Sequence, residues 1–338
     1  MMTESISIKD IAKRANTSIT TVSFVINGRA KEKNISKEVT AKVLSLVDEL
    51  GFRPNLFARG LRTGKSHTIC FLVDDISDPF YSGIARFIEE KAALNGYKIL
   101  LSSIRNRKNS IRELIGIFNE RRVDGFIIAA PVGMEEEVKC LIDSQAPVVL
   151  FDHYLPAIQA DYVLVDNYMS TYNATNHLIQ NGYHNCAFIT TGIHQQKMID
   201  RGEGYKKAVS ERNCEELILE LSYHGPGSMV RGIGEFLAGP HHIDAVIFGA
   251  NYITMEGLRS LKNPGNQLRD DIALVSFDDF ELLEFISPPM TAIVQPLEDI
   301  AEQIIELLVA KLDRESGVFS TINIPCSLNV RESSAARL

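Results

Sequence analysis

The chain has 338 residues, 45% hydrophobic and 23% charged, so two or three globular domains are expected and stabilising disulfides are not needed. Its five cysteines are scattered without a C-x-x-C pair, which argues against a cysteine-type zinc site and fits a reducing cytoplasm; we expect neither a metal nor a cofactor. The sequence contains no secretory signal and no run of roughly 18 apolar residues, so no membrane partner is expected.

The net charge of −8 is unevenly distributed along the chain. Residues 1–66 contain 12 Lys and Arg against 6 Asp and Glu, whereas the remaining residues contain 23 against 37. A basic segment attached to an acidic body predicts a polyanionic partner for that segment alone.

Three short helices are predicted in the basic segment. Ser7 can cap the first, Ser18 can cap a second that runs from Ile19 to about Ile26, and the third begins after Ser36. The second helix buries one face through Val22 and leaves the opposite face free. Two helices joined by a tight turn and braced by a third are typical of a helix-turn-helix DNA-binding domain, although a plain three-helix bundle fits the same spacing.

The segment from Ile8 to Asn27, IKDIAKRANTSITTVSFVIN, closely resembles the signature of the LacI/GalR (lactose/galactose repressor) family of bacterial transcription factors. The similarity extends from about Ile6 to the C-terminus. It implies DNA contacts by the base-reading residues Ile19, Thr20 and Phe24, by the phosphate-binding residues Thr21 and Ser23, and by Ser7, Thr17, Ser18 and Asn27. Phe24 replaces the arginine or histidine often found there, so we expect it to touch a thymine methyl group or to read DNA shape.

Residues 53–63 are similar to the hinge helix of the same family. Such a helix is too short to be stable alone, so it should order only with DNA and a partner subunit present. The resemblance implies that Leu61 wedges into the minor groove, with Asn55, Arg59 and Arg62 as further DNA contacts. A flexible linker is the alternative, and Gly60 favours it.

The acidic body alternates short apolar runs with amphipathic stretches from Thr68 onward. This alternation predicts an α/β core of two doubly wound parallel-sheet lobes, with late crossing strands at Thr291–Gln295 and Ile322–Ser327. The predicted domains are a helix-turn-helix head (1–52), a hinge (53–66) and a core (67–338). Lobe one covers about 67–164 and 297–322, and lobe two covers about 166–294 and 325–338.

Polar residues follow several predicted strands, where open α/β sheets bind their ligands. Asp152 follows the fourth strand, Arg201 precedes a helix of the second lobe, and Asp278 ends a later strand. Carboxylates, amides and an arginine beside aromatic residues suit a polyhydroxylated ligand. Loop capping is the alternative role for the two aspartates.

The body resembles the family's effector core, which is similar to periplasmic sugar-binding proteins. The resemblance implies effector contacts by Phe80, Tyr81, Asp152, Arg201, Asn251, Asp278 and Gln295. Gln295 could instead be purely structural. Tyr252 departs from the aspartate common after the asparagine, which leaves the identity of the ligand open.

No G-x-S-x-G, H-E-x-x-H or Walker motif is present, so we do not expect an enzyme. The expected function is that of a ligand-responsive transcriptional regulator, in our interpretation a repressor. It would bind a palindromic operator in double-stranded DNA as a cytoplasmic homodimer, with a sugar or sugar phosphate as effector. The alternatives are a cytoplasmic sugar-binding protein or a carbohydrate-acting enzyme, neither of which explains the basic head.

Overall fold

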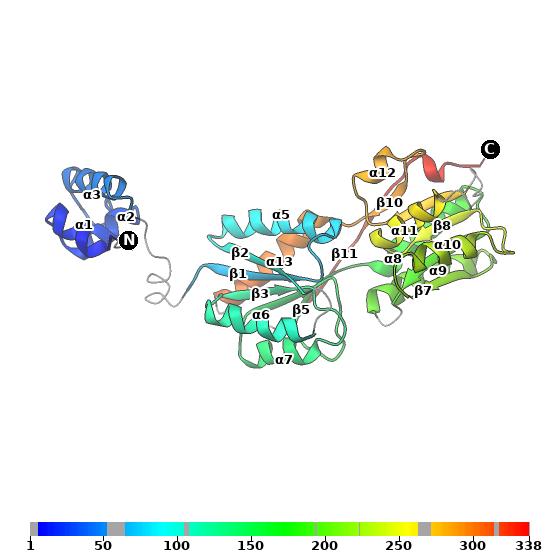
Figure 1. Cartoon of the computed structure of the whole chain (residues 1–338), viewed down its shortest axis with the longest axis horizontal. Helices are drawn as coiled ribbons and strands as arrows, with labels where there is room; N and C mark the ends of the chain where they lie inside the picture. The colour runs from blue at the N-terminus through cyan, green and yellow to red at the C-terminus, as the bar shows by residue number, and fades with distance from the viewer. Residues whose placement is uncertain are drawn as a thin grey trace. The chain divides into compact units, whose positions relative to one another are not determined.

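The computed structural model describes residues 6–52, 65–104, 108–192, 195–222, 224–262, 272–313 and 318–337. The chain divides into two compact units, residues 1–66 and residues 67–338 (Figure 1). Each unit has its own hydrophobic core.

The head contains three helices, α1 (Ile8–Ala15), α2 (Ile19–Ile26) and α3 (Lys37–Glu49). The predicted cap of α2 is confirmed, because the N–H of Thr21 donates to Ser18 Oγ at 3.0 Å. Helix α3 begins after Ser36 as predicted, and the N–H of Val39 donates to Ser36 Oγ at 3.2 Å. At the start of α1, Asp10 Oδ2 accepts the N–H of Ser7 at 2.9 Å. These bonds satisfy N–H groups that a helix start would otherwise leave unpaired.

The core of the head is small and is shared by all three helices. Ile11, Val22 and Val43 contribute one fully buried side chain from each helix. Between α1 and α2 the chain turns at Asn16, which has a φ of 53° and ends α1 in the left-handed region that asparagine tolerates. This tight turn fixes α2 against α1 and leaves the face of α2 that carries Ile19 in solvent.

The second unit contains two six-stranded sheets, and Figure 1 shows each as the centre of a lobe. The first has the order β11-β5-β4-β3-β1-β2 and the second the order β12-β10-β9-β8-β6-β7. The first is built from β1 (Thr68–Val73), β2 (Lys98–Ser103), β3 (Gly125–Ile128), β4 (Val148–Phe151), β5 (Asp161–Val165) and β11 (Thr321–Ile324). The second is built from β6 (Cys186–Thr191), β7 (Leu217–Leu221), β8 (Ala245–Phe248), β9 (Ala273–Phe277), β10 (Thr291–Val294) and β12 (Ser327–Asn329).

The predicted parallel pairing is confirmed for neighbouring strands of both sheets except at β12, which runs antiparallel to β10. The crossing predicted over 322–327 does run between the two lobes, and it spans the ends of two strands. Pro325 and Cys326 separate β11 from β12, and the two strands belong to different sheets. Proline has no N–H to donate to a sheet ladder, so the chain leaves the first sheet there.

Helices cover both faces of each sheet, as the continuous apolar strands require. The helices of the first lobe are α5 (Pro79–Leu94), α6 (Lys108–Glu120), α7 (Glu135–Asp143) and α13 (Leu297–Leu312). Those of the second lobe are α8 (Asn167–Gln180), α9 (Gln196–Glu211), α10 (Ser228–Leu237), α11 (Asn251–Leu261) and α12 (Leu282–Phe285), followed by a short 3₁₀ turn at Glu332–Ser334. Alternate side chains of β1 divide between two cores: Phe71 packs with α5 and α13, whereas Leu72 packs with α6 and α7.

The chain passes between the lobes three times, after β5, after β10 and after β11. Helix α13 therefore packs in the first lobe although it follows the main strands of the second. The three passages lie beside the ends of the strands that carry the polar residues described next.

Candidate ligand pocket and nucleic-acid interface

A cavity of about 260 Å³ is lined by residues of both lobes. All seven residues predicted for the ligand pocket lie on its wall: Phe80, Tyr81, Asp152, Arg201, Asn251, Asp278 and Gln295. The rest of the lining consists of Asp74, Asp75, Asp78, His153, Gln195, Lys197, Met198, Ala250 and Tyr252. Side chains from distant parts of the sequence thus meet at one site.

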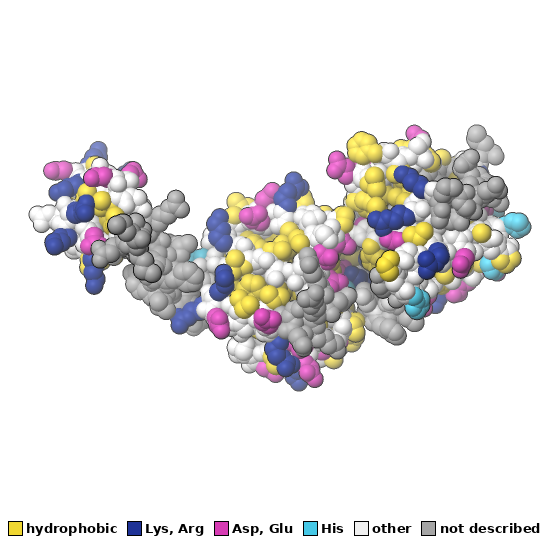
Figure 2. Space-filling view, in the orientation of Figure 1, with side chains coloured by type: hydrophobic (Ala, Val, Ile, Leu, Met, Phe, Trp, Pro, Cys, Tyr) yellow, Lys and Arg dark blue, Asp and Glu magenta, His cyan; other side chains and the backbone are white. Residues whose placement is uncertain are grey.

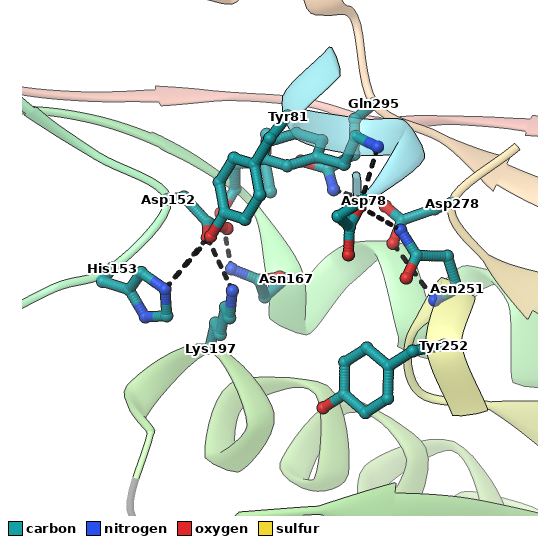
Figure 3. A network of polar contacts seen from close by, with 12 residues as sticks. Asp78, Tyr81, Asp152, His153, Asn167, Lys197, Asn251, Tyr252, Asp278 and Gln295 are labelled. Atoms are coloured by element: carbon teal, nitrogen blue, oxygen red, sulfur yellow. Dashed lines mark hydrogen bonds and ion pairs between the residues drawn. The ribbon is translucent and has the colours of Figure 1, made fainter. Parts of the chain in front are cut away.

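Asp152 and Asp278 occupy equivalent places in the two lobes. Asp152 follows β4 and Asp278 follows β9, and each of these strands is third from the same edge of its sheet. Both residues have positive φ values, 63° and 79°, in a region that aspartate tolerates better than most residues. The left-handed turn ends each strand and leaves the carboxylate on the pocket wall (Figure 3).

Asp152 accepts hydrogen bonds from side chains of both lobes. Tyr81 donates its hydroxyl to Asp152 Oδ2 at 2.7 Å, and Lys197 Nζ of α9 lies 2.6 Å from the same oxygen (Figure 3). Burial is the largest influence and raises the pKa of Asp152, but the charges of Lys197 and His153 and the hydrogen bonds from Lys197 and Tyr81 together hold that pKa well below its ordinary value. Asp152 is therefore a carboxylate, and its ion pair with Lys197 joins the two lobes.

His153 lies beside this ion pair and is neutral at pH 7. Its Nε2 is 3.3 Å from the hydroxyl of Tyr81, and the side chain is buried. Burial and the positive charge of Lys197 lower the pKa of His153 to about 3. The histidine therefore adds a polar surface to the pocket without adding charge.

Arg201 is buried and held by several partners. Its Nε donates to Asn167 Oδ1 at 2.8 Å, its Nη1 donates to the carbonyl of Gly249 at 2.7 Å, and its guanidinium carbon is 3.4 Å from the ring centre of Phe277. The prediction that Arg201 precedes a helix was wrong, because α9 begins at Gln196 and Arg201 lies inside it. The residue before α9, Gln195, makes no side-chain capping bond, so the sequence gives no clear start signal there.

A second network of hydrogen bonds joins Asp78, Asn251, Asp278 and Gln295. Asn251 Nδ2 donates to Asp78 Oδ1 at 2.6 Å, its backbone N–H donates to Asp278 Oδ2 at 3.3 Å, and Gln295 Nε2 donates to Asp278 Oδ1 at 2.5 Å (Figure 3). Asp78 also caps α5 through the N–H of Phe80. Burial and then the neighbouring aspartates raise the pKa of Asp78. The bond between Asp78 and Asn251 is a second polar connection between the lobes.

Aromatic rings supply the apolar part of the wall. Phe80 and Tyr81 contact each other edge to face with ring centres 5.1 Å apart. Tyr252 is 42% exposed, and its hydroxyl is 2.6 Å from Thr191 Oγ1. Exposed ring surface beside carboxylates and amides is the usual combination for a ligand with hydroxyl groups on a ring.

Lys197 was not among the predicted pocket residues. It precedes Arg201 by four positions on α9, so the two cations share one face of the helix. A helix predicted from Gln196 would have placed Lys197 beside Arg201. The tertiary contact with Asp152, 45 residues away in the sequence, has no local signal.

In the head, the residues predicted to contact DNA surround α2. Ile19 and Thr20 are exposed, and Thr17, Thr21 and Ser23 are partly exposed. Several of the others make local bonds: Ser7 with Asp10, Ser18 with Thr21, and Asn27 with the carbonyl of Ser23 at 2.7 Å. Asn55, Arg59, Leu61, Arg62 and the rest of the predicted hinge up to residue 64 lie outside the described residues.

Phe24 is partly buried against two cations. The guanidinium of Arg29 and the ammonium of Lys33 each lie 5.6 Å from its ring centre. Arg29 in turn pairs with Glu32 through two bonds of 2.6 and 2.7 Å. Figure 2 shows further Lys and Arg side chains on the surface of the head.

The residues that the structure describes offer neither an evident metal site nor a membrane span. They contain no group of three or more His, Cys, Asp or Glu residues suited to holding a metal ion. None of the described helices is both long and apolar enough to cross a membrane.

Together these features define a class of protein, a two-lobed α/β receptor with a pocket between its lobes and a helix-turn-helix head. Residues 7–55 match the model of the bacterial regulatory proteins of the lacI family, and residues 175–334 match that of the periplasmic binding protein-like domain. The HTH-type transcriptional repressor PurR of Vibrio campbellii is 30% identical over 316 residues, which cover 91% of this chain and 93% of PurR. The chain belongs to the LacI family, and it is accordingly a DNA-binding transcriptional regulator and not an enzyme.

Solved structures agree with this fold. The transcriptional regulator CelR in complex with cellobiose has a TM-score of 0.72 and 25% identity, covering 97% of this chain and 99% of CelR. The lac repressor dimer bound to operator has a TM-score of 0.85 at 19% identity, covering 98% of this chain and 100% of that one. At that identity the second comparison shows the architecture alone.

Proposed function

We propose that the protein is a repressor that binds a palindromic operator as a homodimer and responds to a sugar or sugar phosphate held between its lobes. The observation that carries this proposal is that one chain combines an exposed helix-turn-helix surface with a polar pocket built from both lobes. PurR, a relative that spans nearly the whole chain, is named a repressor. CelR, which also spans it, binds cellobiose.

For DNA binding, α2 would enter the major groove. Ile19, Thr20 and Phe24 would read bases, while Thr21 and Ser23 would bind phosphates. Ser7, Thr17, Ser18 and Asn27 would complete the contact, with Asn55, Arg59, Leu61 and Arg62 in the minor groove and along the backbone. The basic charge of residues 1–66 supports this assignment, because phosphate neutralisation supplies much of DNA affinity.

For effector binding, the seven predicted residues Phe80, Tyr81, Asp152, Arg201, Asn251, Asp278 and Gln295 would contact the ligand. Their carboxylates and amides can bond hydroxyl groups, and Phe80 and Tyr81 can pack against a sugar ring. The cavity volume of about 260 Å³ is near the small end of ligand pockets, roughly 300–1,000 Å³, and favours an occupant of monosaccharide size.

For the homodimer, large apolar side chains exposed on the first lobe support an interface there. Leu94 at the end of α5, Leu101 on the edge strand β2 and Ile117 on α6 are 84%, 40% and 39% exposed. Figure 2 shows hydrophobic side chains gathered on that lobe. Pairing of two copies through this surface would keep two heads together, as a palindromic site requires.

The direct test is selection of genomic fragments by the purified full-length chain at fixed salt, with random-sequence DNA as competitor. We expect enriched fragments to share an inverted repeat and to bind at least 10³-fold more tightly than random DNA. Equal affinity for selected and random fragments, in the presence and absence of candidate sugars, would contradict the proposal.

A further inference from the structure

The wall of the pocket carries more negative than positive side chains. Among its described residues are five aspartates, and the only cations are Lys197 and Arg201. His153 is neutral at pH 7, since burial lowers its pKa to about 3. The described lining therefore holds more aspartates than cations, and Asp152 and Asp278 both place a carboxylate on the wall that an entering anion would meet.

Both cations are engaged by the protein itself. The ammonium of Lys197 lies 2.6 Å from Asp152 Oδ2, and the two side chains are 14% and 4% exposed. Arg201 donates to Asn167 and to the carbonyl of Gly249 while its guanidinium lies on the ring of Phe277. Neither cation resembles the open arginine or lysine cluster that binds a phosphate group.

The aspartates around the cavity accept hydrogen bonds, so a ligand that fits them must donate hydrogen bonds. An ionised carboxylate has about four sites that accept hydrogen bonds and none that donates. Hydroxyl groups donate to such sites, whereas a phosphate monoester carries about −1.5 to −2 charge and offers mainly acceptors. The carboxylates of Asp78, Asp152 and Asp278 thus match hydroxyl groups and oppose a phosphate.

Resting on the proposed effector function, we propose that the ligand is an unphosphorylated polyol and that Asp152 excludes phosphate esters by neutralising Lys197. Without the carboxylate of Asp152, Lys197 would present a nearly buried ammonium beside the cavity. An ammonium in such surroundings binds anions strongly, because little water screens the interaction. Asp152 is then the residue that makes this pocket selective for a free sugar over its phosphate ester.

The substitution Asp152→Asn tests this role with little change in shape. Asparagine is isosteric and tolerates the left-handed backbone at φ 63°, and its amide oxygen can still accept from Tyr81. The double variant Asp152→Asn/Lys197→Met removes the ammonium as well. Asp161→Asn is a matched control, because Asp161 is a buried partner of Lys311 at 2.5 Å outside the pocket lining.

Isothermal titration at fixed ionic strength would use ribose with ribose 5-phosphate, glucose with glucose 6-phosphate, and inorganic phosphate. For the wild type we expect each free sugar that binds to do so at least tenfold more tightly than its phosphate ester. Asp152→Asn should gain at least tenfold in affinity for inorganic phosphate, whereas the double variant and Asp161→Asn should not.

Two results would overturn the inference: tighter binding of a phosphate ester than of its free sugar by the wild type, or no gain of phosphate binding in Asp152→Asn. If none of these sugars binds the wild type, that result weakens the proposed sugar effector. The phosphate titration of Asp152→Asn then decides the role of Asp152 separately. Circular dichroism of each variant would establish that it is folded.

Discussion

Asp152 and His153 are adjacent in sequence and both are buried, yet at neutral pH only the aspartate is charged. Burial raises the pKa of Asp152, but the charges of Lys197 and His153 and the hydrogen bonds from Lys197 and Tyr81 together lower it by more. For His153, burial and Lys197 act in the same direction and lower its pKa to about 3. One lysine therefore stabilises the charged form of one neighbour and the neutral form of the other.

This difference predicts a pH dependence of folding. An unfolded chain protonates His153 near pH 6.5, whereas the folded chain keeps it neutral, so stability from this residue is present above pH 6.5 and is lost as the pH falls. Between pH 6.5 and 5 the loss is about 2 kcal/mol. Urea unfolding of the wild type and of His153→Asn at pH 7.5 and pH 5 would measure it, as a decrease in their stability difference.

A stability difference that is the same at both pH values would contradict the lowered pKa. The ion pair of Asp152 does not interfere in this window. The pKa of that carboxylate is below its ordinary value, so its contribution is present above about pH 4 and is lost only in stronger acid.

Phe24 is the residue of α2 whose role can be tested most simply. Its ring contacts Arg29 and Lys33, and it cannot donate a hydrogen bond to a base. We expect Phe24→Ala to weaken binding to a selected operator by about 1–3 kcal/mol and to leave binding to random DNA nearly unchanged. Fluorescence anisotropy with both DNAs would measure the two affinities.

Lys33→Met provides the comparison for Phe24→Ala. The substitution removes one positive charge from the basic head, so it should weaken both kinds of binding alike and lower the dependence of affinity on salt. Equal losses on the operator and on random DNA for Phe24→Ala would assign Phe24 to support of the head and not to sequence reading.

The residues of the pocket were predictable to different degrees. Asp152, Asn251 and Asp278 follow recognisable apolar strands, so their position at the strand ends follows from the sequence pattern. Arg201 was placed by resemblance to the family, with its helix predicted to start too late. The engagement of Lys197 by Asp152 depends on how two lobes meet, and no local pattern contains that information.

At the scale of elements, helices α8 and α9 pack closely at Gly204. A Cβ at this position would lie 2.2 Å from the carbonyl oxygen of Tyr168 and 3.1 Å from the backbone nitrogen of Tyr172. These are backbone atoms, so the helices would have to move apart. We expect Gly204→Ala to lower the free energy of unfolding by about 3 kcal/mol, at the upper end of overpacking effects. Thermal and urea unfolding would measure the change.

Gly116 in α6 is the matched control, because a Cβ there meets nothing within 4 Å. Alanine has the higher helix propensity, so Gly116→Ala should stabilise the protein by roughly 0.5–1 kcal/mol. If Gly204→Ala were as stable as Gly116→Ala, the close approach of α8 and α9 would be contradicted.

The elements themselves were predicted best where a side chain marks their ends. Ser18 and Ser36 cap α2 and α3, and both starts were correct. Helix α9 lacks such a cap and was predicted too short. A crossing between the lobes was expected at 322–327, and there Pro325 and Cys326 separate β11 of the first sheet from β12 of the second.

For the whole molecule, the proposed regulation requires that the pocket and the head influence each other. Among the described residues, the polar connections of Lys197 with Asp152 and of Asn251 with Asp78 join the lobes, and both lie in the pocket wall. A ligand bound there contacts both lobes and can stabilise one of their arrangements over another. Such coupling is worth typically 1–3 kcal/mol, or 5–150-fold in affinity.

The most direct test of this account is a measurement of the linkage between ligand and DNA. The affinity of the full-length chain for a selected operator is measured with and without a sugar that binds the pocket, and the affinity for that sugar with and without operator. We expect both affinities to change by the same factor, between 5 and 150, because coupling between binding sites is reciprocal. A sugar that binds the pocket but leaves operator affinity unchanged would contradict ligand control of DNA binding.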